Sequence, residues 1–523
     1  MLLPPRHGRS SRRRWVAAVL IVVLSAIAIA IKVLGSHAEP IMRKRVIETL
    51  SACFNSRVEL DGFHVAVSDG LQVSGEGLRV FRAVSETEHE SVPLLAIKAF
   101  RFSSSVWALL ESPMRVRRVY LEGLQVGIPP KGERQRFRLA GREAGKIRMV
   151  VDEFLSDQAT LVIYPSKPGK LPLEFDIGEL KLRSIGPGRP MHFEAKLVNP
   201  KPVGDIHTTG SFGPFDSDSP GDSPVGGRYQ FTNADLGTIK GIGGTLSSSG
   251  AYSGTLDHIV VDGETHTPDF RINISGRPVP LDTKFHAIVD GTSGDTYLQP
   301  VEAKLLDSHI TANGFVVKRP ELKGHQVKLD VTVHNARIDD LLKLGIRTDP
   351  PIMTGGVRIV TSFDLPPGQA DVSDRLRLSG SFSVWNARFS SDKIQRTVDS
   401  LSLRSQGKPQ LAELNTPVGL PSRIAGKFSL RNSLLTFPRL DFQVPGTAVN
   451  LAGVYSLDGN RFEFHGKARF DAKLSHMVTG WKSIVLKPAD LFFSRNGETV
   501  LPVKISGTKS EPHFGLDFGQ KKK

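Results

Sequence analysis

The stretch RFEFHGKARFDAKL, residues 461–474, alternates polar and apolar residues without a break. A period of two places alternate side chains on opposite faces of a β-strand. The pattern therefore predicts a strand with one charged face in water and one apolar face that something must cover. At about 3.3 Å per residue such a strand is longer than the usual five or six residues. A turn at His465-Gly466 would shorten it without changing its two faces.

The same alternation recurs along the chain. It is clearest at residues 327–334, VKLDVTVH, and shorter versions occur at residues 173–177, 192–197, 270–275, 375–384 and 513–518. Most of these runs are bounded by Gly, Pro, Asn or Asp, which are the usual turn residues. Long periodic helices are nearly absent beyond the first hundred residues. The pattern indicates a mainly β protein built on an antiparallel sheet with one apolar face.

The N-terminal segment predicts a membrane anchor. Residues 15–31 are apolar except for Ser25, and five arginines precede them. This run reaches the lower limit for spanning a bilayer, and residues 32–34 extend it because a lysine head can snorkel to the interface. Basic residues favour the cytoplasmic side, so the rest of the chain would be exported. The anchor residues singled out are Trp15, Leu20, Leu24 and Ile31.

A cleaved signal peptide is the alternative interpretation of this segment. Ser36 and Ala38 offer small residues before a cleavage site. The apolar run is longer than the usual 7–15 residues of a signal sequence. We therefore favour a retained anchor.

Composition excludes several classes of protein. The single cysteine, Cys53, cannot form an intramolecular disulfide, so the core alone must stabilise the exported part. The net charge of +15 is concentrated at the ends: the first 34 residues carry six basic residues and no acidic one, and three lysines end the chain. The remainder has no basic stripe and gives no case for a nucleic-acid partner. Phe is the dominant aromatic residue, with 28 against 6 Tyr and 4 Trp, which suits dry apolar surface.

Three short helical segments and an irregular repeat complete the expected organisation. An amphipathic helix is predicted over residues 41–54, another over 338–344, and a third candidate lies at 106–111. The repeat is Gly-x-Phe/Tyr, which would start a strand with Gly and an aromatic residue on one face. It occurs at residues 210–212, 250–252, 380–382, 426–428 and 453–455. Its spacing is too uneven for a propeller or a fixed-period solenoid and favours one long meander of hairpins.

No catalytic motif is found in the sequence. There is no nucleophile elbow, no HExxH, no phosphate-binding Gly loop and no paired-cysteine spacing. Residues 390–393, SSDK, match Ser-x-x-Lys without its companion motifs and are interpreted as a loop. The acidic stretch at 216–227 lacks the glutamate of a calcium loop and contains two prolines. We expect neither an enzyme nor a metal or other cofactor.

The region from residue 58 to 129 resembles the N-terminal module of the AsmA family of bacterial envelope proteins. The resemblance rests on VELDGFHVAVSDGLQVSGEGLRVF and LLAIKAFRFSSSVWALLESPMRVRRVYLEGLQVGI. The second stretch matches the family's strand–helix–strand, in which V-x-L-E/D-G falls at Val119, Leu121, Glu122 and Gly123. Further on, LVNPKPVGDIHTTGSFGPF, TPDFRINISG, VDGTSGDTYLQPV and VPGTAVNLAGVYSLDG are similar to the strands and turns of large AsmA-like proteins.

The resemblance implies an N-terminal transmembrane helix followed by an elongated, curved β-sheet groove, shaped like a taco, with a few short helices. It also implies a role in outer-membrane biogenesis, with phospholipid carried between the membranes along the groove. The expected parts are a cytoplasmic basic segment (1–14), an anchor (15–34), an AsmA-like module (35–130), the groove (131–520) and a basic tail (521–523). The expected location is the bacterial inner membrane, single-pass, with the N-terminus cytoplasmic and most of the chain periplasmic.

Acyl chains, together with the opposite wall of the groove, would then cover the apolar strand face. The expected partners are phospholipid, the inner membrane and an outer-membrane or periplasmic protein. The residues expected to face lipid are Phe462, Phe464, Phe470, Leu474, Val327, Leu329, Val331 and Val333. Three alternatives stay open: an ordinary curved sheet or sandwich with a closed core, a non-transporting structural or assembly factor, and an outer-membrane barrel. The apolar N-terminal segment and the terminal lysines disfavour the barrel.

Overall fold

The structure is a computed structural model. It describes residues 39–44, 46–48, 50–51, 57–67, 70–81, 93–105, 107, 114–128, 149–163, 173–185, 190–214, 220–273, 277–319, 324–347, 349–414, 418–457, 461–479, 487, 494–495, 498–508 and 511–517. The predicted anchor at residues 15–34 and the boundary predicted near residue 130 lie outside these ranges. The helix predicted at 106–111 is described only at Trp107.

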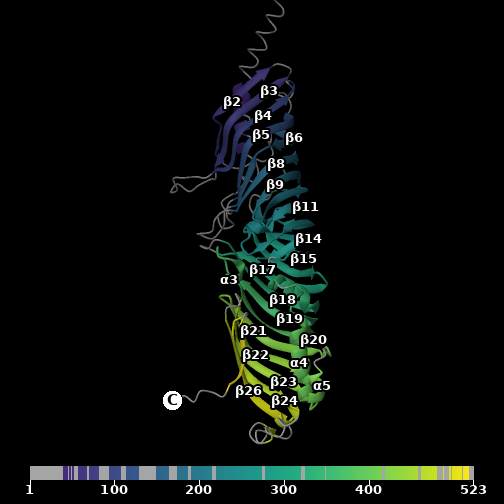
Figure 1. Cartoon of the computed structure of the whole chain (residues 1–523). Coiled ribbons are helices and arrows are strands. Elements are labelled where there is room, and N and C mark those ends of the chain that lie inside the picture. Colours follow the sequence, from purple (N-terminus) through teal and green to yellow (C-terminus); the bar gives the residue numbers. More distant parts are fainter. Residues whose placement is uncertain are drawn as a thin grey trace, which may run out of the picture.

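The described chain forms one continuous sheet of 27 strands, stacked along a long axis from β2–β4 at one end to β24 and β26 at the other (Figure 1). The first part contains β1 (Val58–Glu59), β2 (Gly62–Val67), β3 (Leu71–Phe81), β4 (Pro93–Ser104), β5 (Met114–Ile128), β6 (Met149–Ser156), β7 (Ala159–Ile163), β8 (Leu173–Ile185) and β9 (Met191–Pro200). The middle contains β10 (Val203–Phe212), β11 (Pro224–Asp235), β12 (Ile242–Gly243), β13 (Thr245–Thr255), β14 (His258–Ile272), β15 (Val279–Asp290), β16 (Asp295–Leu305), β17 (Ser308–Lys318), β18 (His325–Arg337) and β19 (Met353–Leu365).

The last part contains β20 (Arg377–Phe389), β21 (Ser422–Arg431), β22 (Leu434–Val444), β23 (Thr447–Ser456), β24 (Phe462–Phe470), β25 (Ser494–Arg495), β26 (Glu498–Gly507) and β27 (Pro512–Leu516). The helical elements are η4 (Pro220–Asp222), η5 (Leu236–Thr238), α2 (Ile338–Gly345), α3 (Val372–Arg375), α4 (Asp392–Ser405), α5 (Pro409–Glu413) and η6 (Leu474–Met477). In addition, the described residues between 39 and 51 are helical. The prediction of a mainly β protein with few helices is confirmed.

The alternating stretch at 461–474 forms a shorter strand than its pattern suggests. β24 spans Phe462–Phe470, and it continues through His465 and Gly466 without a turn, paired with β23 on one side and β26 on the other. After Phe470 the N–H of Asp471 bonds to the carbonyl of Gly446, and Leu474 begins η6. Leu474 therefore does not lie on the strand face, and its prediction as part of that face is wrong.

The sheet is mixed, which corrects the prediction of a purely antiparallel one. β5 pairs in parallel with both β6 and β7, whereas the other pairings in the described part are antiparallel. Parallel neighbours need a long connection, because the chain must return to the starting edge. Residues 129–148 between β5 and β6 provide that length. The alternating pattern shows which face a residue occupies but not the direction of the neighbouring strand.

The helix predicted at 338–344 is confirmed as α2, whereas α4 was not predicted. Residues 390–393, interpreted as a loop, in fact start this helix: the Ser391 hydroxyl accepts a hydrogen bond from the N–H of Ile394 as an N-cap. The buried side of α4 is mostly polar and includes Gln395, Asp399 and Ser402. Because that side carries few apolar residues, the sequence shows no clear hydrophobic period there.

Asp399 explains how this polar helix face is stabilised. Its carboxylate is almost fully buried and accepts backbone N–H bonds from Val418 (2.8 Å), Gly419 (2.9 Å) and Leu420 (2.9 Å). The amide of Gln395 donates a fourth bond at 2.8 Å. Bonds from several donors compensate the cost of burying a carboxylate. The cluster therefore fixes α4 to the segment that leads into β21.

An Asn-Ala pair lies near the end of three of the strands. Asn233, Asn335 and Asn386 have left-handed backbones (φ 56, 48 and 52°), and each lies in a register shift of its strand. In each case the following alanine is almost completely buried, and a helical element follows within a few residues: η5, α2 or α4. Asn tolerates this conformation better than most residues, and a bulge redirects the strand. The repeat thus places helices along one margin of the sheet.

The buried core is concentrated in two clusters. The larger lies between the N-terminal helix and β2–β6, and includes Met42, Leu71, Val73 and Val116, each at most 1 % exposed. The smaller gathers Val333, Val357 and Val384 beneath α2. The described residues of the helix predicted at 41–54 are helical. Met42 faces this core, whereas Ile41 is exposed.

We expect Asn386→Gly to leave the end of β20 stable and Asn386→Val to destabilise it by about 1–2 kcal/mol. A β-branched residue in a left-handed backbone loses about this much stability, whereas glycine does not. Hydrogen exchange of the β20 and α4 amides measures the effect locally, which suits a long sheet that can open in parts. Equal protection in the two variants would contradict the role of the bulge.

Candidate functional site: the inner face of the sheet

One face of the sheet is continuous in register over most of its length. Paired Cα atoms place side chains of neighbouring strands on the same side. Phe464 pairs with Gly453 and Ile505, and Val331 pairs with Ala312 and Thr361. We call the side that carries Phe464 the inner face, and the side that carries Glu463 the outer face.

The inner face is apolar, and the outer face is charged. On β18 the inner set is Val327, Leu329, Val331 and Val333, whereas Lys328 and Asp330 point the other way and are exposed. On β24 the same division separates Phe464 from the exposed Lys467 and Arg469. The strand alternation predicted from the sequence is therefore confirmed on these strands.

Most inner-face side chains between β9 and β24 are only half-buried. The strands of the described part pack chiefly against their neighbours in the sheet, with α2, α4 and η5 touching the strands near one margin. A closed sandwich would bury these side chains, because two packed sheets interdigitate to form a dry core. The described residues form no such second layer over the centre of the inner face.

Aromatic rings lie flat over glycines on this face. A Cβ added to Gly453 would come within 2.6 Å of the Phe464 ring, and one on Gly263 within 2.7 Å of the Phe285 ring. Phe437 links Phe464 and Phe382, with ring centroids 5.9 Å and 6.3 Å away. Gly and aromatic share the inner face, as the Gly-x-Phe/Tyr repeat predicts. The glycines lie within strands, however, so the expectation that they start strands is wrong.

The eight residues predicted to face lipid divide into three groups. Phe462, Phe464, Val327, Leu329 and Val331 are half-buried on the inner face. Val333 and Phe470 are only 5 % and 7 % exposed, so protein already covers them. Leu474 lies in η6, as described above. The first group is what remains of the candidate site.

The two margins of the sheet meet at one place. We call the side of the sheet formed by the C-terminal ends of β11, β18 and β20 the first margin; the loop with Lys240 and Gly241 lies there. The second margin is the opposite side, where β19 ends and α3 follows. In Figure 1, α3 and α4 lie on opposite sides of the sheet. Yet the N–H of Val372 in α3 donates to the Lys240 carbonyl at 3.4 Å, and Gly241 packs against Val372. The loop at Lys240 on the first margin therefore contacts α3 on the second margin, which follows a strand seven neighbours along the sheet from β11.

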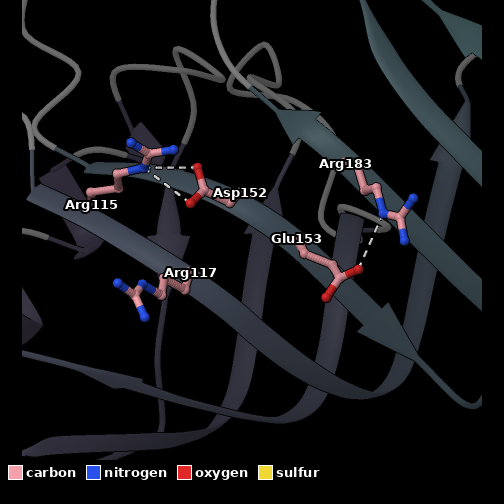
Figure 2. Close-up of a pocket in the computed structure, with 5 residues that line it drawn as sticks. All are labelled: Arg115, Arg117, Asp152, Glu153 and Arg183. Atoms are coloured by element: carbon pink, nitrogen blue, oxygen red, sulfur yellow. Dashed lines mark hydrogen bonds and ion pairs between the residues drawn. The ribbon is translucent and has the colours of Figure 1, made fainter.

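A charged hollow lies near the parallel strands, lined by Arg115, Arg117, Asp152, Glu153 and Arg183 (Figure 2). Asp152 accepts two bonds from the Nε of Arg115, both at 3.0 Å. Glu153 contacts Arg118 at 2.7 Å, Arg183 at 3.2 Å and Lys181 at 3.4 Å. Because each carboxylate binds cations from neighbouring strands, we interpret the hollow as an ion network joining β5, β6 and β8.

Comparisons with known proteins give no relative: no family model, no curated protein and no solved structure matches the chain significantly. Among the described residues, no helix has the length and apolar character needed to cross a membrane. The described residues also contain no group of three or more His, Cys, Asp or Glu side chains placed to hold a metal ion. The inner face is therefore the feature on which a functional argument rests.

The Glu153 network predicts a specific acid sensitivity. The Arg118 hydrogen bond, with help from Arg183 and Lys181, lowers the pKa of Glu153. A lowered pKa means that the carboxylate stabilises the fold above its unfolded pKa of about 4.3, and that this contribution is lost as the pH falls through the folded pKa. Glu153→Gln should therefore reduce stability by about 1–2 kcal/mol at pH 7 and by less near pH 3.

Hydrogen exchange of β6 and β8 at the two pH values, corrected for intrinsic rates, measures this difference. Glu179→Gln is the matched control, because Glu179 forms one exposed pair with Lys196 on neighbouring β9. An equal loss at pH 7 and pH 3 for Glu153→Gln would contradict the assignment.

Proposed function

We propose that this protein binds phospholipid acyl chains on the inner face and conveys them along the sheet, as the resemblance to AsmA-like envelope proteins implies. The observation that carries the proposal is the half-buried apolar face that runs in register from β9 to β24 without a described second layer. Soluble proteins rarely expose apolar patches larger than a few hundred Å², and larger patches indicate binding to lipid or protein.

The chemistry of the face suits acyl chains better than a folded protein partner. Flat rings over glycines, as at Phe464–Gly453 and Phe285–Gly263, make a smooth apolar surface, and the charged residue Lys318 lies only at the end of a strand. A protein interface also carries a polar rim and specific hydrogen bonds. Mobile hydrocarbon requires apolar area alone, since its transfer from water is non-directional.

The elongated shape suits conveyance between two membranes. Figure 1 shows the strands stacked side by side along one long axis instead of folded back into a second layer. In this proposal residues 15–34 anchor the chain in a bacterial inner membrane, and the sheet extends through the periplasm toward the outer membrane. The alternative is a structural or assembly factor of the cell envelope that carries no lipid.

A photo-crosslinking residue at position 464 should capture phospholipid in the purified full chain, and the same residue at position 463 or 467 should not. Phe464 lies on the inner face, whereas Glu463 and Lys467 lie on the outer face of the same strand, β24. Mass spectrometry identifies the adducts. Adducts only to protein at position 464 would favour a closed core, and lipid adducts at all three positions would indicate non-specific contact.

Phe464→Asp should lower lipid loading on the order of tenfold or more while the sheet stays folded. A carboxylate facing hydrocarbon costs about 2.5–3.5 kcal/mol, but the side chain at a half-buried position can still reach water. Phe464→Leu is the matched control and should keep its lipid. A folded Phe464→Asp variant with unchanged lipid content would refute conveyance along this part of the face.

A further inference from the structure

Six hydroxyl side chains form a band on the mostly apolar inner face. They come from five consecutive sheet neighbours, β10, β11, β13, β14 and β15, and all six are half-buried. We call them the hydroxyl band: Thr208, Tyr229, Ser248, Tyr252, Thr265 and Thr283. Register connects them, because Thr208 pairs with Tyr229, and Thr265 pairs with both Ser248 and Thr283.

The hydroxyls are joined in three pairs across the strands. Thr208 lies 2.7 Å from the Tyr252 hydroxyl, Tyr229 lies 3.1 Å from Ser248, and Thr265 lies 2.7 Å from Thr283. Tyr252 and Tyr229 lie over glycines: a Cβ on Gly227 would come within 2.7 Å of the Tyr252 oxygen, and one on Gly263 equally close to that of Tyr229. The glycines therefore hold both phenol oxygens close to the sheet surface.

The donor and acceptor roles of the hydroxyl groups decide which hydrogen bonds the two tyrosines can form with a ligand. Thr208 donates its hydrogen to the carbonyl of Arg228 at 3.0 Å, so Tyr252 must donate to Thr208. Ser248 donates to the carbonyl of Glu264 at 2.9 Å, so Tyr229 must donate to Ser248. Each hydroxyl has one hydrogen and two acceptor sites. Both phenol oxygens have thus used their hydrogen and present lone pairs to the inner face.

The band is uncharged. Charged residues of the same strands, such as Asp262 and Lys284, are on the outer face. Burial raises the pKa of both Tyr229 and Tyr252, which keeps the phenols protonated at neutral pH. A bare phosphate would find no cation here, and an acyl chain would leave the lone pairs unpaired. The complementary group is a hydrogen-bond donor.

We propose that the hydroxyl band binds the N–H or O–H donors of a lipid headgroup, with the Tyr229 and Tyr252 oxygens as acceptors. This inference rests on the proposed lipid-carrying function and adds selectivity to it. Lipids whose headgroup ends in an amine or a hydroxyl would be retained at the band, whereas a headgroup without such donors would not. The shared chemistry is the donor, which phosphatidylethanolamine supplies as an ammonium and phosphatidylglycerol as hydroxyls.

The test compares two lipids that differ only in donors. The purified full chain is loaded from vesicles that contain equal amounts of phosphatidylethanolamine and phosphatidylcholine with identical acyl chains, and mass spectrometry measures the bound ratio. Wild-type protein should prefer phosphatidylethanolamine roughly fivefold, the factor that one net hydrogen bond gives. A parallel loading replaces phosphatidylethanolamine by phosphatidylglycerol and shows whether hydroxyl donors suffice.

The double variant Tyr229→Phe/Tyr252→Phe should lose the preference and keep its total lipid, because the rings that cover the glycines remain. Tyr455→Phe is the matched control, since Tyr455 lies on the inner face of β23 outside the band. Equal binding of both lipids by the wild type, or an unchanged preference in the double variant, would overturn the inference. Absence of both lipids from the wild type would instead overturn the proposed function itself.

Discussion

The structure depends on one constraint: most strands beyond β8 must cover their apolar side using little more than their two neighbours in the sheet. In an ordinary domain a second layer supplies that cover. Here the described strands from β9 to β24 rely on cross-strand pairs instead, as when Phe464 lies over Gly453 and touches Phe437. Such pairs are each worth only about 0.2–1 kcal/mol, so the stability of the sheet is spread over many small contacts.

The same constraint explains which elements of the fold the sequence predicts and which it does not. Alternation at 327–334 and 461–474 identified the strands and their faces correctly, because a period of two is a local property of the chain. It overestimated β24, because the hydrogen bond that ends it, from Asp471 to Gly446, joins residues distant in sequence. It missed the parallel β5–β6 pairing, which depends on a connection outside the alternating segments. It missed α4, whose buried side is held by Asp399 and other polar groups.

The candidate site was predictable in outline only. The sequence identified five half-buried inner-face residues, including Phe464 and Leu329, but it could not show that α2 covers Val333. It gave no signal for the hydroxyl band. Tyr229, Ser248 and Thr265 are far apart in the chain and come together only through strand register. The Asn-Ala bulges carried a detectable signal, since Asn233, Asn335 and Asn386 each precede an alanine, but their meaning requires the left-handed φ that the structure shows.

The two ways in which the inner face is covered have different consequences. Beneath the N-terminal helix and α2, side chains are fully packed, and dense packing leaves no room for a mobile guest. Elsewhere the rings remain half-exposed, and the margins approach each other through a backbone contact between Lys240 and Val372 instead of an apolar plug. In our proposal, this contact limits access from solvent without filling the space below it. The same sheet can therefore be closed where it must be stable and open where, in our proposal, lipid passes.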